Sequence, residues 1–211
     1  MTSLPLLTLG GCEIHTHTRE TATDAIVEAL PSSAIGGPVL LGIDGRSGSG
    51  KTHLAGDIAD RLRRRHTYVV MVSMDDLYAG WEGLAASLPT LCDQVITPLS
   101  QARPGAYRRY DWERGTFAET VTIPPADVVL VEGVGSTAHA CRHLLNVTVW
   151  VHASRDIRLS RACGREGQGN FAVYADRWAA QEDVLFGVDS HPQAPPGYDF
   201  VVSTDSVLVD G

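Results

Sequence analysis

The sequence predicts a three-layer α/β fold built on a central parallel sheet, and three observations support this prediction. Short apolar runs recur along the chain, within residues 39–43, 68–73, 127–133, 146–151 and 198–203. Segments with apolar residues at helical spacing lie between most of these runs. A glycine-rich loop follows the first run directly. Strands that alternate with helices in this order form a parallel sheet with helices on both faces.

The expected helices and a hairpin fill the intervals between the strands. The helices are expected at residues 21–30, 52–62, 81–101, 137–145, 154–163 and 171–186. A β-hairpin is expected at about 105–124, where two arms flank a short polar turn. Residues 1–37 are expected to form a strand-and-helix prelude packed on the core, and residues 38–211 the main domain.

Composition narrows the class of protein. The net charge of −8 over 211 residues argues against a general nucleic-acid binder, and no stretch reaches the length of a membrane-spanning helix. The four cysteines have no C-x-x-C pairing and no metal-ligand spacing, so we expect reduced, mostly buried thiols. We therefore expect a cytoplasmic protein. We expect it to bind a small molecule and to bind neither nucleic acid nor a membrane. A homo-oligomer is compatible with the sequence.

The glycine-rich loop matches G-x-x-x-x-G-K-[ST], the phosphate-binding P-loop. Its expected nucleotide-binding residues are Gly45, Arg46, Ser47, Gly48, Ser49, Gly50, Lys51 and Thr52. Glycines allow successive N–H groups to point at a phosphate, and the following helix adds the positive end of its dipole. Lys51 is the only lysine beside sixteen arginines. A compact ammonium suits a phosphate, so we expect Lys51 to stabilise charge during phosphoryl transfer.

Carboxylates follow two of the apolar runs. Glu132 is the acid that ends the apolar strand 128–132, where a carboxylate could hold Mg²⁺ together with the Thr52 hydroxyl. Asp75 and Asp76 follow the run at 68–73, and one of them could accept the proton of an attacking hydroxyl. The residues alone do not decide between Asp75 and Asp76, and the other acid is expected to be a helix cap or a loop residue.

The first arm of the hairpin interleaves aromatic and basic residues. Tyr107, Tyr110 and Trp112 offer stacking faces for a planar substrate, and Arg108 and Arg109 offer forked donors. Ordinary packing of the hairpin is the alternative interpretation of the same residues.

Arginines precede a second glycine-containing loop. Arg158, Arg161 and Arg165 lie at i, i+3 and i+7, so they share a helical face. A short arginine lid at about 161–170 could neutralise charge on the transferring phosphoryl group and close over it. The alternative is a solvated basic face.

Taken in order, these motifs resemble the uridine kinase and phosphoribulokinase branch of P-loop kinases. The matching segments are 44–52, Ser73-Met74-Asp75-Asp76-Leu77-Tyr78, Tyr110-Asp111-Trp112, Val131-Glu132-Gly133 and Arg158-Leu159-Ser160-Arg161 with Arg165-Glu166. The resemblance implies a P-loop NTPase fold, ATP and Mg²⁺ as cofactors, Asp75 as the base, and Arg161 and Arg165 as lid arginines. It also implies that Tyr78, Tyr110 and Trp112 lie near the acceptor, and residues 198–204 near the adenine.

The sequence therefore predicts an ATP- and Mg²⁺-dependent kinase that phosphorylates a hydroxyl of a nucleoside, uridine- or cytidine-like, or of a similar small alcohol. The expected substrate-binding residues are Asp75, Tyr78, Tyr107, Arg108, Tyr110 and Trp112. Two alternatives stay open: a nucleotide or other metabolite as acceptor, and a nucleotide-dependent switch or assembly ATPase that transfers no phosphate. The sequence carries neither the N-K-x-D signature of GTPases nor an L-S-G-G-Q-like stretch of transporter ATPases.

Overall fold

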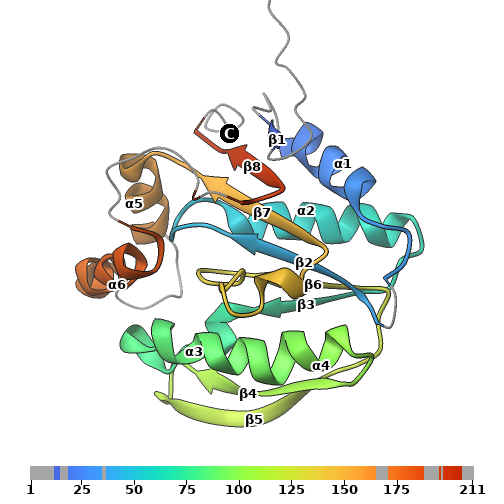
Figure 1. Ribbon diagram of the computed structural model, residues 1–211. Helices are drawn as coiled ribbons and strands as arrows, with labels where there is room; N and C mark the ends of the chain where they lie inside the picture. Colours follow the sequence, from blue (N-terminus) through green and yellow to red (C-terminus); the bar gives the residue numbers. More distant parts are fainter. Residues whose placement is uncertain are drawn as a thin grey trace, which may run out of the picture.

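The central sheet consists of six parallel strands, which confirms the predicted three-layer α/β architecture (Figure 1). The structure is a computed structural model that describes residues 12–14, 19–34, 37–164, 171–187, 195 and 197–205. In spatial order the strands are β1 (Cys12–Ile14), β8 (Phe200–Ser203), β7 (Val147–His152), β2 (Val39–Asp44), β6 (Val128–Glu132) and β3 (Val69–Ser73).

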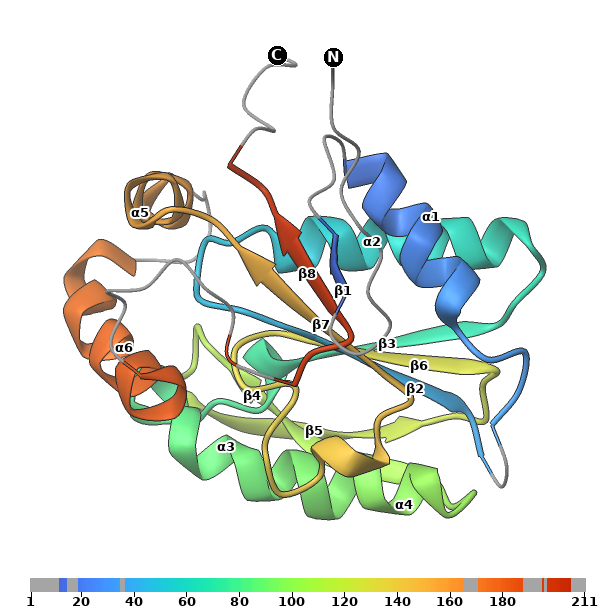
Figure 2. The same cartoon turned by 45° about the horizontal axis from the view of Figure 1, so that its top comes forward.

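Helices cover both faces of the sheet. Helices α1 (Arg19–Ala29) and α2 (Lys51–Arg64) lie on one side, and α3 (Leu84–Thr90) and α4 (Thr97–Ser100) lie on the other (Figure 2). A π-helical segment, Leu91–Ile96, joins α3 to α4, so the predicted mixed helical stretch is confirmed. Short 3₁₀ helices occur at Met74–Asp76, Gly80–Glu82 and Arg142–Leu144.

Three further elements surround the carboxyl edge of the sheet. The predicted hairpin forms from β4 (Gly105–Asp111) and β5 (Thr116–Ile123), which pair antiparallel. Helices α5 (Arg155–Cys163) and α6 (Phe171–Phe186) lie beside the ends of β2 and β7 in both views. These elements can therefore supply side chains to whatever binds at that edge.

Two apolar clusters, one on each face, hold the layers together. Ile26, Leu41 and Ile58 are fully buried between the sheet and α1 and α2. Leu91 and Val129 are fully buried on the opposite face. Each fully buried aliphatic side chain contributes about 1.5–3 kcal/mol of transfer free energy, so the sheet is a rigid base for the loops that leave it.

The strand register brings three separate segments to one edge. Glu132 pairs with Ile43 on one side and with Ser73 on the other. Strands β2, β6 and β3 therefore end at the same level, and ligands of open parallel sheets bind outside these carboxyl ends.

Two predictions from the sequence are wrong. Cys92 and Cys141 are not free thiols: they form a disulfide, because the π-helical segment and the loop after β6 bring their Cα atoms to 5.4 Å. The predicted helix at 137–145 is absent apart from one 3₁₀ turn, because Thr137 donates its N–H and hydroxyl to the carboxylate of Asp44. Cys163 is a free, exposed cysteine.

Some predictions fall on residues that the structure does not describe. Arg165 and the rest of the predicted lid, 165–170, lie outside the described residues, as do residues 1–11. Within the described part of the chain, no helix is both long enough and apolar enough to cross a membrane.

Candidate active site

The phosphate loop connects β2 to α2 and takes a shape that only glycine permits at Gly48. The φ angle of Gly48 is 77°, and a Cβ atom there would lie 2.1 Å from the backbone oxygen of Arg158. Gly50, with φ of 99°, stands at the N-cap of α2, so the helix begins directly at Lys51. The backbone N–H groups at this turn and the positive end of α2 are the features that bind a phosphate.

Lys51 lies in the floor of this loop. Its side chain is 7% exposed, and Nζ donates to the carbonyl oxygen of Arg46 at 3.0 Å. Burial lowers the pKa of Lys51, and the carboxylates of Glu182 and Glu132 act in the opposite direction. The ammonium is thus held beside the phosphate loop by one carbonyl and by nearby negative charge.

Thr52 and Glu132 meet at the start of α2 and the end of β6. The Thr52 hydroxyl donates to Glu132 Oε2 at 3.2 Å, and the Ser73 hydroxyl donates to Oε1 at 2.9 Å. A hydroxyl and a carboxylate next to a phosphate loop are oxygen ligands of the kind that Mg²⁺ prefers. The residues present therefore fit a magnesium ion at this position.

Asp44, the last residue of β2, ties the phosphate loop to the loop after β6. Its buried carboxylate accepts hydrogen bonds from the N–H groups of Gly45 and Gly135 on Oδ1, and from the N–H and hydroxyl of Thr137 on Oδ2. Burial raises the pKa of Asp44, against the lowering effect of these donors. Because the Thr137 hydroxyl donates to Asp44, the Tyr198 hydroxyl must donate to Thr137.

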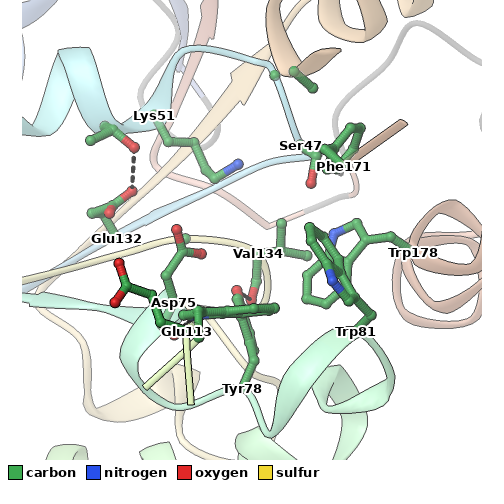
Figure 3. A pocket seen from close by; sticks show the side chains of 15 residues that line it. Ser47, Lys51, Asp75, Tyr78, Trp81, Glu113, Glu132, Val134, Phe171 and Trp178 are labelled. Carbon is green, nitrogen blue, oxygen red and sulfur yellow. Dashed lines mark hydrogen bonds between the residues drawn. The ribbon is translucent and has the colours of Figure 1, made fainter. Parts of the chain in front are cut away.

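The structure separates the two candidate bases. Asp75 lines a cavity that also contains Lys51, Thr52 and Glu132 (Figure 3). Asp76 instead accepts a hydrogen bond from the hydroxyl of Tyr107 at 2.9 Å. Of these two carboxylates, Asp75 lies at the cavity and Asp76 lies against the hairpin.

The cavity has a volume of about 410 Å³, and its wall opposite the phosphate loop is largely aromatic. Five aromatic side chains line it: Tyr78, Trp81, Trp112, Phe171 and Trp178. They form a connected group, in which Trp81 packs edge-to-face on Trp112, Phe171 and Trp178. The buried Tyr78 donates its hydroxyl to the Val134 carbonyl oxygen at 2.7 Å, which leaves its ring as the cavity surface.

Three of the expected substrate-binding residues lie outside the residues that line the cavity. Tyr107 is 3% exposed and bonded to Asp76, and the Arg108 guanidinium donates to the carbonyl oxygens of Phe117 and Ala118 across the hairpin. Tyr110 packs edge-to-face on Trp112, which is one of the rings that line the cavity. For these residues the hairpin-packing interpretation describes the structure better.

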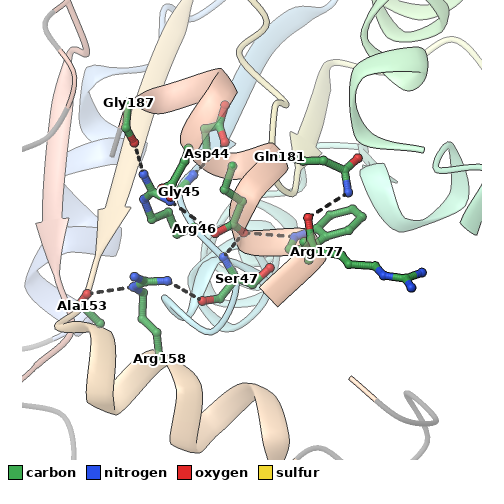
Figure 4. Close-up of polar contacts among 12 residues, drawn as sticks. Asp44, Gly45, Arg46, Ser47, Ala153, Arg158, Arg177, Gln181 and Gly187 are labelled. Carbon is green, nitrogen blue, oxygen red and sulfur yellow. Dashed lines mark hydrogen bonds and ion pairs between the residues drawn. The ribbon is translucent and has the colours of Figure 1, made fainter. Parts of the chain in front are cut away.

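Two arginines of α5, Arg158 and Arg161, support the phosphate loop from outside the cavity. The Arg158 guanidinium donates to the carbonyl oxygens of Ala153 at 3.1 Å and Ser47 at 3.3 Å (Figure 4). The Arg161 guanidinium donates to the hydroxyl and carbonyl oxygens of Thr204, whose hydroxyl in turn donates to the Ser49 carbonyl. Arg158 is therefore not part of a solvated basic face. Arg161 is connected to the loop through Thr204.

Sequence reasoning missed the contribution of helix α6 to the site. Trp178 lines the cavity, and Glu182, one turn later, accepts a hydrogen bond from the Ser47 N–H of the phosphate loop. The signal available in the sequence was a tryptophan and a glutamate at i, i+4 in a helix near the arginine segment.

Together, the fold and the site define a P-loop kinase. No family model matches the chain. It is 30% identical over 145 residues to the uridine kinase of Lactobacillus helveticus, a span that covers 61% of this chain and 68% of that protein.

A solved structure of a possible uridine kinase from Bacillus stearothermophilus aligns with a TM-score of 0.57 at 22% identity, over 87% of this chain and 97% of that one. The D-glycerate 3-kinase of Cryptococcus neoformans aligns with a TM-score of 0.53 at 15% identity, over 88% and 93% of the two chains. At these identities the two structures show the shared fold alone. The chain belongs to the uridine kinase family, and it is a phosphotransferase.

Proposed function

We propose that this enzyme transfers the γ-phosphoryl group of ATP to a hydroxyl of an uncharged small alcohol, with a nucleoside as the foremost candidate. One observation carries the proposal: a single cavity contains Lys51, the Thr52–Glu132 pair, Asp75 and an aromatic wall. The first three features suit phosphoryl transfer, and the aromatic wall suits a molecule with a planar ring.

Each side chain has a definite part in the proposed reaction. Asp75 accepts the proton of the acceptor hydroxyl while the hydroxyl oxygen bonds to the γ-phosphorus and the bond to the leaving oxygen of ADP breaks. Lys51 and the loop N–H groups stabilise the negative charge that develops on the transferring group. Thr52 and Glu132 would hold Mg²⁺, which neutralises phosphate charge when bound. The aromatic wall excludes water, so hydrolysis is suppressed.

Charge in the cavity argues against an anionic acceptor. Among the described residues that line the cavity, Lys51 is the only cation, and it lies at the phosphate loop. Asp75 and Glu113 supply negative charge on the acceptor side. Arg108 and Arg109, the candidates for binding an acceptor phosphate, are engaged within the hairpin, by backbone carbonyls and by Glu119 respectively. An uncharged alcohol therefore fits better than a nucleotide or a sugar acid.

A screen for ADP release tests the proposal. The purified enzyme with ATP and Mg²⁺ is offered nucleosides, then other neutral alcohols, and then anionic acceptors. We expect acceptor-dependent ADP release with at least one neutral acceptor, and little release without an acceptor. Slow release that no acceptor stimulates would instead identify a nucleotide-dependent switch, and a preference for anionic acceptors would refute the charge argument.

Two variants then assign the base. Asp75→Asn should lower kcat by a factor of about 10²–10⁴, the usual contribution of a general base, while ATP binding stays intact. Asp76→Asn is the matched control, because its carboxylate contacts Tyr107 instead of the cavity. A mild effect at Asp75 with a large effect at Asp76 would transfer the role to Asp76. Lys51→Ala should abolish transfer in the same assay.

A further inference from the structure

The phosphate loop is bonded to a buried carboxylate on helix α6. Glu182 is 2% exposed, and its Oε1 accepts the Ser47 N–H at 2.7 Å. The same Oε1 accepts the indole N–H of Trp178 at 3.0 Å. Trp178 presents its ring to the acceptor cavity, so one oxygen atom connects the cavity wall to the phosphate loop.

Arg46 attaches the loop to the same helix from the other side. Its guanidinium donates to Asp183 at 2.8 Å and to the carbonyl oxygen of Gly187 (Figure 4). Arg46 Nη1 also lies 3.7 Å from Glu182 Oε2. The first half of the phosphate loop is thus held to α6 through both its backbone and a side chain.

The negative charge of Glu182 opposes nucleotide binding. A buried charge is unfavourable unless it is paired and hydrogen-bonded, and Glu182 is close enough to Lys51 to counteract the effect of burial on its pKa. A negative charge here also repels the phosphates that the loop binds. The favourable contribution of Glu182 therefore comes from its ion pair with Arg46 and from its two hydrogen bonds, one of which fixes the Ser47 turn.

We propose that Glu182 is a positioning residue that holds the Ser47 turn of the phosphate loop and links it to Trp178 in the acceptor cavity. The inference rests on the proposed function, because it assumes that a nucleotide occupies the loop. Binding of nucleotide at the loop should then change the environment of Trp178 through Glu182. Contact of an acceptor with Trp178 should likewise change the affinity of the loop for nucleotide.

Two substitutions separate the hydrogen bonds from the charge. Glu182→Gln removes the charge but keeps an amide oxygen that can accept both N–H groups. Glu182→Ala removes the charge and the acceptor together. Val184→Ala is the control for a shortened side chain on the same helix, since Val184 is 88% exposed.

The first measurement is the Kd of MgADP by titration calorimetry. We expect Glu182→Ala to bind MgADP at least about tenfold more weakly than Glu182→Gln, within the range of one buried hydrogen bond to a loop amide. Val184→Ala should match the wild type. Equal affinities of the alanine and glutamine variants, within about twofold, would overturn the proposal.

The second measurement tests the link to Trp178. In protein labelled with 5-fluorotryptophan, MgADP should move the ¹⁹F resonance of Trp178 in the wild type and in Glu182→Gln, and should not move it in Glu182→Ala. A shift that persists in Glu182→Ala shows that Trp178 senses the nucleotide without Glu182 and overturns the link. If the wild type does not bind MgADP at all, the proposed function itself fails, and the inference fails with it.

A third variant covers the case in which Glu182→Ala does not fold. Trp178→Phe keeps an aromatic ring in the cavity wall, although a smaller one, and removes the donor to Glu182. It should weaken MgADP binding about threefold or more, although the ring lies on the acceptor side. Unchanged affinity in this variant would overturn the proposal.

Discussion

The substitution Asp44→Asn tests how the phosphate loop is held to the rest of the site. One side-chain oxygen of Asp44 accepts the N–H groups of Gly45 and Gly135, and the other accepts the N–H and hydroxyl of Thr137. Asparagine has the same shape but only one acceptor oxygen. Its NH₂ group must therefore face one of these two pairs of donors.

The size of the effect follows from that geometry. One or two buried donors lose their acceptor, because the Thr137 hydroxyl can turn to accept from the amide. Each unsatisfied buried group costs about 1–3 kcal/mol, so the expected loss is about 1–6 kcal/mol. Asp44 is 1% exposed, which leaves little access for water to replace the lost bonds. A domain of this kind has a free energy of unfolding of about 5–15 kcal/mol, so the variant should fold but be strongly destabilised.

Urea unfolding followed by tryptophan fluorescence measures this loss. Asp127→Asn is the matched control, because the exposed Asp127 carboxylate accepts a single N–H, that of Tyr68. We expect the control to lose less than about 1 kcal/mol. A loss below about 1 kcal/mol at Asp44 as well would refute the claim that this carboxylate holds the two loops together.

Three further predictions concern the acceptor wall, the metal site and the disulfide. Trp112→Ala should raise the acceptor KM about threefold to tenfold with little change in the KM for ATP. Phe117→Ala is the control. The Trp112 and Phe117 side chains are similarly exposed, at 39% and 36%, but of the two only Trp112 lines the cavity. Thr52→Val should raise the Mg²⁺ concentration needed for half-maximal activity about tenfold or more without loss of stability, and an unchanged Mg²⁺ titration would exclude the hydroxyl as a ligand. Cys92→Ser should lower the free energy of unfolding by up to about 4 kcal/mol, the loop-closure estimate for a separation of 49 residues. A reductant should destabilise the wild type but not the variant. Equal sensitivity of both proteins to the reductant would contradict the disulfide.

The phosphate side of the cavity could be placed from the sequence because it depends on local pattern and strand register. The run before Gly45 and the run before Glu132 identify two buried strands, and parallel strands bring their carboxyl ends to one edge. Lys51 and Thr52 then follow from the loop motif alone. These residues do lie together in the structure, although their roles stay predictions.

The acceptor side could not be placed in the same way, because it is built from segments without a diagnostic spacing. Trp81 lies within a short 3₁₀ helix and Trp178 lies in a helix with apolar residues on several sides, so the sequence does not distinguish either from a core residue. The aromatic and basic pattern of the hairpin predicts Tyr107 at the substrate, whereas the structure buries it against Asp76. The disulfide was missed for a related reason, since no local pattern connects Cys92 to Cys141.

The phosphate side and the aromatic wall of the cavity should have different effects on substrate selectivity. Phosphate binding requires backbone N–H groups in one fixed shape. Glu182 and Arg158 contact the loop that supplies them, and Arg46 of the loop donates to Asp183 of α6. The acceptor wall consists of aromatic rings that meet at angles between 62° and 89° around Trp81, with one stacked neighbour, Tyr174. Apart from Trp178, whose indole is bonded to Glu182, the rings of this wall can be changed by single substitutions without moving the phosphate loop. Selectivity among neutral acceptors should therefore depend on the rings around Trp81, whereas the rate of transfer should depend on the loop and its contacts with α6.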